Sequence, residues 1–156
     1  MARSSRAARE IRVRPMRASD AARVAELSGQ LGYPATAEQL NARFRHVVAR
    51  EDSCVLVAED PSGSVVGWVH VLERLVLEAE PHAEIGGLVV DEGARRSGVG
   101  RALVAAAEHW AAERGLSEVV VRTNVERSEA PVFYRGVGYE LVKTSLKFRK
   151  RLRREP

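Results

Sequence analysis

The stretch that decides the fold reads AEIGGLVVDEGARRSGVGRAL and spans residues 83–103. Its first part, residues 83–90, is mostly apolar, which is typical of a strand in a buried sheet. A turn rich in glycine and arginine follows and opens the clearest helix of the chain, expected at about 100–114 and ended by Gly115. The segment therefore predicts a strand, a tight turn and a helix in direct succession.

The turn between strand and helix has the chemistry of a phosphate site. Backbone amides at a helix N-terminus, together with the positive end of the helix dipole, bind phosphate oxygens. Gly98 and Gly100 let the backbone approach a ligand closely. Arg95, Arg96 and Arg101 add positive charge beside it. If only the glycines are considered, the alternative is a plain glycine-rich turn that binds no ligand.

Two familiar phosphate loops do not match this turn. A P-loop requires Lys and then Ser or Thr after its second glycine, whereas Val99 and Gly100 follow Gly98. The dinucleotide fingerprint requires a third glycine three residues after Gly100, and that position is Leu103. The loop therefore belongs to neither class.

The spacing of the turn resembles the acyl-CoA signature of the GCN5-related N-acetyltransferase (GNAT) superfamily, which reads Gln/Arg-x-x-Gly-x-Gly/Ala. Arg95, Gly98 and Gly100 occupy those positions after an apolar strand. A second stretch, APVFYRGVGY at residues 130–139, resembles the family's Ala-x-x-Phe-Tyr-x-x-x-Gly-Phe/Tyr. Two motifs in the correct order identify the chain as a member of this superfamily over about residues 10–148.

The resemblance implies an acyl-CoA site on this loop, with acetyl-CoA as co-substrate. In the family the strand before the signature splays from its neighbour at a bulge, for which Gly86-Gly87 is the expected place. Backbone groups of that strand would pair with the pantetheine arm, loop amides would hold the pyrophosphate, and an asparagine after the next strand would bond the arm. The implied cofactor-binding residues are Leu88, Val89, Val90, Arg95, Arg96, Ser97, Gly98, Val99, Gly100, Arg101 and Asn124.

The implied reaction is direct acetyl transfer from a thioester to an amine. An amine with a pKa near about 10.4 is mostly protonated at neutral pH, so a base must remove its proton. Glu84, on the strand before the loop, resembles the base position of histone-acetylating relatives. The alternative is that Glu84 only orients an amine or a water. The rival bases are Glu73, Glu78, Glu80 and His82.

Tyr134 is the candidate acid, because a CoA thiolate with a pKa of about 8.5 leaves more easily when it is protonated. Its alternative role is that of an aromatic packing against the cofactor. A backbone amide near Leu88 or Val89 would stabilise the oxyanion. No metal is expected, because the four histidines show no paired ligand spacing.

The whole pattern predicts an α/β protein with a mixed sheet, a GNAT-like fold of order β-α-α-β-β-β-α-β-α-β-β whose splayed central sheet is flanked by helices. Residues 73–82 are expected to form an acidic loop. The expected strands are 11–13, 53–59, 65–72, 83–90, 118–122, 139–142 and 145–148, and the expected helices begin at Ser19-Asp20, at a Thr36/Gln39 capping box, at 100 and at 128.

Length and composition fit one globular domain. The 156 residues are 45% hydrophobic and 29% charged, which argues against disorder. No apolar run approaches the roughly 18–20 residues of a membrane helix, and the N-terminus lacks the apolar centre of a secretory signal. Cys54 is the single cysteine, so a reducing cytoplasmic location is expected. We expect a single acyl-CoA N-acyltransferase domain over 1–156, with a core at about 10–148 and basic ends at 1–9 and 149–156.

The positive charge is concentrated at the two ends of the chain. The net charge is +4, yet residues 1–17 carry six arginines and one glutamate, and residues 143–156 carry seven basic residues and one acidic residue. The segment between them is therefore acidic, which argues against a nucleic-acid partner. The basic tail at 147–154 leaves an RNA or an acidic partner open.

The acceptor is the part that the sequence defines least. Four glutamates on or near the strand before the loop favour a cationic amine. Three functions are therefore considered: acetylation of a small cationic amine, acetylation of a protein Lys or N-terminus, and a non-catalytic acyl-CoA-binding module. No membrane partner is expected, and a homodimer through the C-terminal strands stays open.

Overall fold

The computed structural model describes residues 10–123 and 129–154, which fall in two compact units, Met1–Arg122 and Thr123–Pro156. The first unit holds a five-stranded sheet of order β1-β2-β3-β4-β5, antiparallel from β1 to β4 and parallel between β4 and β5. Its elements are β1 (Arg12–Pro15), α1 (Ala21–Gln30), α2 (Ala37–Val48), β2 (Ser53–Glu59), β3 (Val65–Val76), β4 (Ala79–Val90), α3 (Val99–Glu113) and β5 (Val119–Val121).

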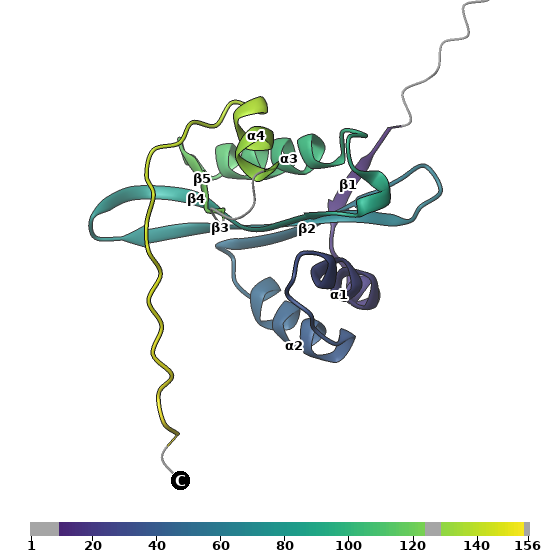
Figure 1. Ribbon diagram of the computed structural model, residues 1–156, viewed down its shortest axis with the longest axis horizontal. Helices are drawn as coiled ribbons and strands as arrows, with labels where there is room; N and C mark the ends of the chain where they lie inside the picture. The colour runs from purple at the N-terminus through teal and green to yellow at the C-terminus, as the bar shows by residue number, and fades with distance from the viewer. Residues whose placement is uncertain (1–9, 124–128, 155–156) are drawn as a thin grey trace, which may run out of the picture. The chain divides into compact units, whose positions relative to one another are not determined.

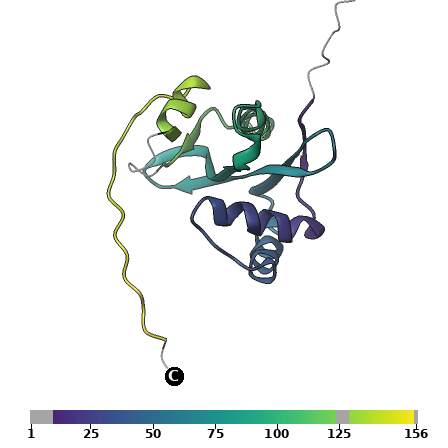
Figure 2. The ribbon, with the colours of Figure 1, turned by 45° about the vertical axis from the view of Figure 1, so that its right-hand side comes forward.

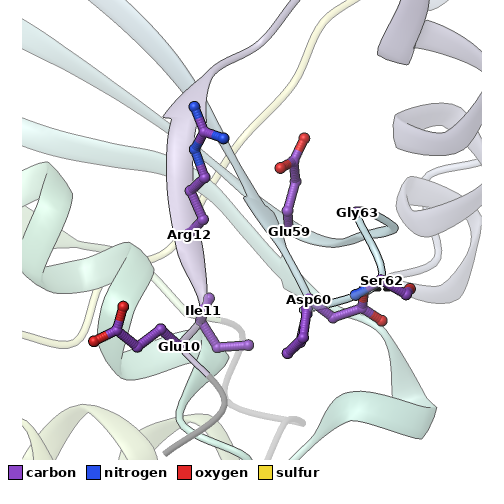
Figure 3. Close-up of a pocket in the computed structure, with 8 residues that line it drawn as sticks. Glu10, Ile11, Arg12, Glu59, Asp60, Ser62 and Gly63 are labelled. Atoms are coloured by element: carbon purple, nitrogen blue, oxygen red, sulfur yellow. Dashed lines mark hydrogen bonds between the residues drawn. The ribbon is translucent and has the colours of Figure 1, made fainter.

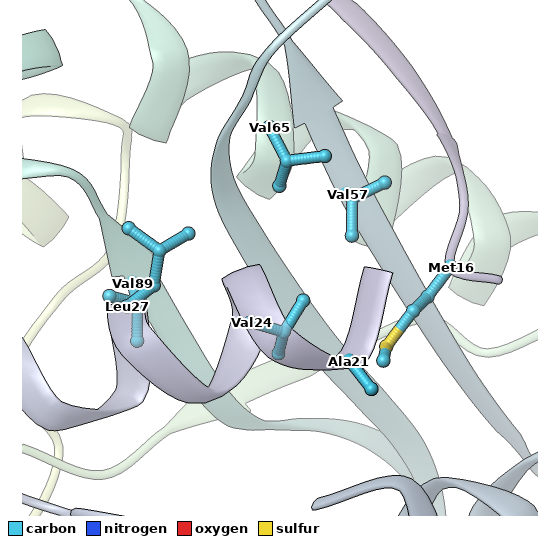
Figure 4. Packing of buried hydrophobic residues seen from close by; sticks show 7 residues of the cluster. All are labelled: Met16, Ala21, Val24, Leu27, Val57, Val65 and Val89. Atoms are coloured by element: carbon cyan, nitrogen blue, oxygen red, sulfur yellow. The ribbon is translucent and has the colours of Figure 1, made fainter. Parts of the chain in front are cut away.

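Within the first unit, α1 and α2 cover one face of the sheet and α3 covers the other (Figures 1 and 2). The mixed α/β architecture predicted from the sequence is confirmed. On the α3 face, Gly67 lets α3 pack closely on β3. A Cβ at Gly67 would lie 2.8 Å from the Val89 carbonyl oxygen and 3.0 Å from Leu103 Cδ1. The core between α1 and the sheet is drawn in Figure 4 and consists of Met16, Ala21, Val24, Leu27, Val57, Val65 and Val89.

Two of the helix starts predicted from the sequence, those of α1 and α2, differ in outcome. At α2, Thr36 Oγ1 accepts from the Gln39 amide and Gln39 Oε1 accepts from the Thr36 amide, both at 3.1 Å, so the capping box is confirmed. At α1, Asp20 occupies the N-cap position but makes no capping hydrogen bond with its side chain. Its carboxylate instead accepts from both Nη atoms of Arg14, at 2.8 and 2.9 Å, and from the Arg17 amide at 2.8 Å, which caps the short 3-10 turn before α1.

The expected acidic loop at 73–82 is wrong, because β3 and β4 continue through it as a long hairpin. The register runs through Glu73↔Ala83 and Arg74↔His82 to Val76↔Ala79. Arg74, Glu78 and Glu80 are exposed there, and so are Leu75 and Leu77, so the apolar alternation typical of a half-buried strand is absent. Backbone pairing, which the sequence pattern does not report, extends both strands.

β4 carries the bulge that was expected at the glycine pair. Its register with β3 passes from Val71↔Ile85 to His70↔Gly87, so Gly86 is the extra residue. β5 pairs with β4 only from Ala83 to Ile85. Beyond the bulge, the edge of β4 that faces β5 therefore has no strand partner in the described ranges 10–123 and 129–154.

The second unit contains α4 (Glu129–Gly136) and an extended segment after it. The Tyr134 ring lies 5.0 Å from that of Phe133 and 5.7 Å from that of Tyr139, centroid to centroid. The closing strands expected at 139–142 and 145–148 are wrong, because no strand pairing includes these residues. Leu141, Leu146 and Phe148 are 69–88% exposed, so no burial offsets the entropy of ordering a strand there.

None of the helices in the part of the chain that is described has the length and apolarity needed to cross a membrane.

The α1 face of the core gives a stability prediction. Leu27 is fully buried, so Leu27→Ala should lower the free energy of unfolding by about 2–5 kcal/mol. Leu75→Ala makes the same truncation at a site that is 70% exposed and should stay within about 0.5 kcal/mol of the parent. Urea unfolding followed by circular dichroism measures both variants. Equal losses in the two would contradict this assignment of the core.

Candidate active site

The glycine-rich turn forms an exposed loop that ends directly in a helix N-terminus. Gly98 is the N-cap of α3 with φ of 87°, a left-handed conformation that favours glycine. The first hydrogen bond of the helix runs from the Ala102 amide to the Gly98 carbonyl at 3.0 Å. The amides of Val99 and Gly100 therefore precede the helical ladder, as the first amides of any helix do. No atom lies within 4 Å of the place of a Cβ on Gly98, so the space over this turn is open.

Positive charge surrounds this turn. Arg95, Arg96 and Ser97 are exposed on the loop, and Arg101 is exposed on the first turn of α3. Arg96 has φ of 63°, which is uncommon for a residue with a side chain. The Val99 side chain is buried in the core, so only its main chain faces the loop. Backbone donors, a helix dipole and guanidinium groups thus meet at one place, as the sequence predicted for an anionic ligand.

Helix α1 holds the start of this loop in place, which sequence reasoning missed. Arg23 donates to Asp91 Oδ2 at 2.8 Å and to the Val65 carbonyl at 2.9 Å. The Gln30 side chain donates to Asp91 Oδ1 at 3.1 Å and accepts from the Glu92 amide at 3.0 Å. The hydrogen bond from Gln30, followed by the bond and charge of Arg23, lowers the pKa of Asp91. Arg23 and Gln30 stand seven positions apart in the sequence, which places them on one face of a helix. This spacing is the only feature of the sequence that relates the two residues.

The residues expected to meet the pantetheine arm lie on β4 after the bulge. Leu88, Val89 and Val90 pair with β3 on one side, and their other side is the edge that β5 does not cover. The Val89 side chain belongs to the core, so its main chain is the part that can face a ligand. Asn124 lies outside the described residues.

Glu84 lies on β4 just before the bulge and is the acidic member of an ion-pair cluster with two arginines. Its side chain is 13% exposed and accepts a hydrogen bond from Arg122 Nη1. Its second oxygen lies 3.7 Å from Arg74 Nε. The Arg122 side chain is 74% exposed, so the arginine end of this pair is solvated while the carboxylate is mostly buried.

The rival bases named from the sequence lie on the hairpin that β3 and β4 form. Glu73 is bound by Arg114 at 2.8 Å, and the ring of His82 lies 2.9 Å from the Glu80 carbonyl oxygen. Glu78 and Glu80 are exposed. None of these groups is placed at the bulge by the strand register.

His70, which carried no motif, does lie at the bulge. Its Nε2 is 2.7 Å from Ser53 Oγ on β2, and its Nδ1 would be 3.5 Å from a Cβ on Gly86. Burial lowers the pKa of His70. A single histidine in a strand gives no sequence signal, because only strand pairing brings β2, β3 and β4 together at this point.

Tyr134 lies on α4 in the second unit. Burial raises its pKa to about 12, so the phenol is protonated at neutral pH. Its ring contacts those of Phe133 and Tyr139, which fits the packing role that the sequence left open.

A separate hollow, lined by Glu10–Arg12 and Glu59–Gly63, lies beside β1 and the β2–β3 turn (Figure 3). It shares no residue with the loop at 91–100 or with β4. Among its lining residues, Asp60 has a carboxylate that accepts from the Ser62 and Ser64 amides and so stabilises the turn. The hollow is therefore separate from the candidate acetyl-CoA site at the loop and β4.

Comparison with known proteins agrees with this geometry. The family described as Acetyltransferase (GNAT) family matches residues 20–148. An aminoglycoside N(6')-acetyltransferase type 1 of Klebsiella aerogenes is 31% identical over 152 residues, covering 90% of this chain and 96% of that protein.

Solved structures share the fold. A putative acetyltransferase from Agrobacterium tumefaciens is 26% identical with a TM-score of 0.78, covering 90% of this chain and 100% of the other. Aminoglycoside N-acetyltransferase AAC(6')-Iy in complex with CoA is 20% identical with a TM-score of 0.81, covering 92% and 96%. The chain therefore belongs to the acetyltransferase (GNAT) family and, as the sequence predicted, is an acetyl-CoA-dependent N-acetyltransferase.

Proposed function

We propose that this protein acetylates a small cationic amine. The observation that carries the proposal is the exposed N-terminus of α3, where Gly98, loop amides and three arginines lie beside the uncovered edge of β4. A pyrophosphate suits the first feature, and an amide-bearing arm suits the second. Arg95, Arg96 and Arg101 supply charge, and the amides from Arg96 to Arg101 supply donors. Bound acetyl-CoA would supply the thioester whose acetyl group is transferred.

The cationic acceptor is supported by the charge on the β3–β4 hairpin and by a relative. The Klebsiella aerogenes protein is named for aminoglycosides, which are polycationic amines. In this chain Glu84 is already engaged by a guanidinium, that of the exposed Arg122. The Arg122 side of this pair is 74% exposed, so a substrate ammonium can compete with Arg122 for the carboxylate. Glu84 is thus a site for the charge of the acceptor.

The proposed reaction moves one acetyl group and two protons. The neutral amine nitrogen forms a bond to the thioester carbon, and the carbon–sulfur bond then breaks. A main-chain amide near Leu88 or Val89 stabilises the oxyanion between these steps. Glu84 is the candidate that either receives the amine proton or only orients the amine, and Tyr134, a phenol protonated at neutral pH, is the candidate that gives a proton to the leaving thiolate.

Acetyl-CoA should raise the melting temperature of the parent protein, because a ligand that binds only the folded state stabilises it by about 2.7 kcal/mol at a hundred times its Kd. Gly98→Asp should abolish the shift by adding a side chain and a negative charge to the loop. Gly63→Asp is the matched control, since Gly63 has φ of 84° and equally open surroundings on the β2–β3 turn. Both variants carry similar backbone strain, so a lost shift in both, or in neither, would refute the loop assignment. Differential scanning fluorimetry measures all three proteins.

Tyr134→Phe should lower kcat by about 10²-fold, with the Kd of acetyl-CoA little changed, because only proton donation is lost. Tyr139→Phe removes a hydroxyl from the neighbouring ring of the same cluster and should keep kcat within a factor of a few. Thiol release measured with a fixed amine gives kcat for both. Equal kcat values in parent and Tyr134→Phe would leave Tyr134 with a packing role.

The acceptor class is tested by a panel that contains aminoglycosides, simple polyamines and lysine-containing peptides at equal concentration. We expect thiol release with the free polycationic amines and at least about tenfold less kcat/KM with the peptides, a difference of ~1.4 kcal/mol in transition-state binding. The reverse order would assign the site to a protein amine.

A further inference from the structure

The middle of the sheet holds a histidine–serine pair that the mechanism above does not use. His70 lies on β3 and is half-buried, and its Nε2 is 2.7 Å from the Ser53 hydroxyl on β2. In the β2–β3 register Ser53 stands opposite Leu72, so its hydroxyl reaches the imidazole diagonally on the same face of the sheet. The bond fixes the ring plane between β2 and β4.

The other ring nitrogen points at the bulge of β4. A Cβ on Gly86 would be 3.5 Å from His70 Nδ1, and Gly86 itself is exposed. Nδ1 makes no hydrogen bond to any residue in the part of the chain that the structure covers. Gly86 places no side chain in front of Nδ1, and Leu72 borders the same space, since a Cβ on Gly86 would lie 3.2 Å from Leu72 Cδ2. The imidazole therefore has one nitrogen anchored and the other open toward the place where β4 parts from β5.

Titratable groups near His70 on this face of β4 already have partners, and the ring of His82 lies 2.9 Å from the Glu80 carbonyl oxygen. Glu84 lies on β4, diagonal to His70 of β3, and forms ion pairs with Arg122 and Arg74. The residues that α1 buries are uncharged, and on α2 the half-buried residues are uncharged too. The charged or titratable residues of α2 are all exposed: Glu38, Arg43, Arg45 and His46.

We propose that His70, oriented by Ser53, receives the proton of the attacking amine at the Gly86 bulge. The inference rests on the acetyl transfer proposed above and assigns Glu84 to holding the charge of the acceptor. In the resting tautomer Nε2–H donates to Ser53 Oγ, and Nδ1 carries the lone pair. The amine nitrogen gives its proton to Nδ1 as its bond to the thioester carbon forms, and the imidazolium then passes the proton to solvent. No oxidant or further reactant is needed.

The physical state of His70 suits this role. Burial lowers the pKa of His70, so the ring is neutral at pH 7 and accepts a proton. The Ser53 hydroxyl accepts a hydrogen bond from Nε2–H. This bond stabilises the charged ring and so offsets part of the lowering of its pKa by burial. Ser53 is thus a positioning residue, and its loss should lower the pKa of His70 further.

The test is the pH dependence of kcat/KM for a polyamine acceptor. The parent should lose activity as the pH falls through the pKa of His70. His70→Gln should lose about 10²-fold in kcat and show no such acid limb, with an unchanged thermal shift by acetyl-CoA. Ser53→Ala should keep the limb but move it to lower pH. His46→Gln, at an exposed histidine of α2, is the matched control and should behave as the parent.

The outcomes separate the two levels of the proposal. A parent that transfers acetyl groups and a His70→Gln variant with the same rate and acid limb would overturn the role of His70 while leaving the function intact. A parent inactive with every amine would overturn the proposed function and this inference with it. If His70→Gln does not fold, the NMR titration of the His70 ring in the parent decides, because its pKa must coincide with the acid limb. A mismatch would reject the proposal.

Discussion

β4 pairs with β3 along its whole length but with β5 only from Ala83 to Ile85, and the extra residue Gly86 separates these two behaviours. An inserted residue breaks the alternation of backbone donors and changes strand direction. Everything proposed for the site depends on that parting, because it leaves one edge of β4 uncovered within the described ranges. A ligand with amide groups can then pair there as an added strand would.

The loop after β4 is joined to the opposite side of the sheet as well as to its own helix. Asp91 is bound by Arg23 and Gln30 of α1, and α1 is the helix whose apolar face builds the core around Leu27. The turn can therefore hold Gly98 in a left-handed conformation on a rigid base. Preorganised amides bind an anion more tightly than mobile ones, because less ordering entropy is lost on binding. The same helix thus supports both the core and the phosphate loop.

The two groups near the bulge differ in what their surroundings allow. Glu84 is charged and paired with guanidinium groups, so it suits the attraction of a cation. His70 is half-buried, bonded to a neutral hydroxyl and neutral at pH 7, so it suits proton transfer. Acid–base work is assigned by such differences in environment rather than by residue type. Tyr134 belongs to the second unit, and burial keeps its phenol protonated at neutral pH but also makes it a weaker acid.

Local sequence determined much of this protein. The strand–turn–helix at 83–103, the capping box of Thr36 and the bulge at Gly86 depend on conformations that neighbouring residues impose, and all three were predicted. Long-range pairing decided the rest. The hairpin through 73–82 and the lack of strand pairing at 139–148 depend on which backbone groups find partners, and Asp20 accepts from Arg14 of β1 in place of capping α1. His70 meets Ser53 and Gly86 only because three strands align, since hydrogen bonds between strands join residues that no local pattern relates.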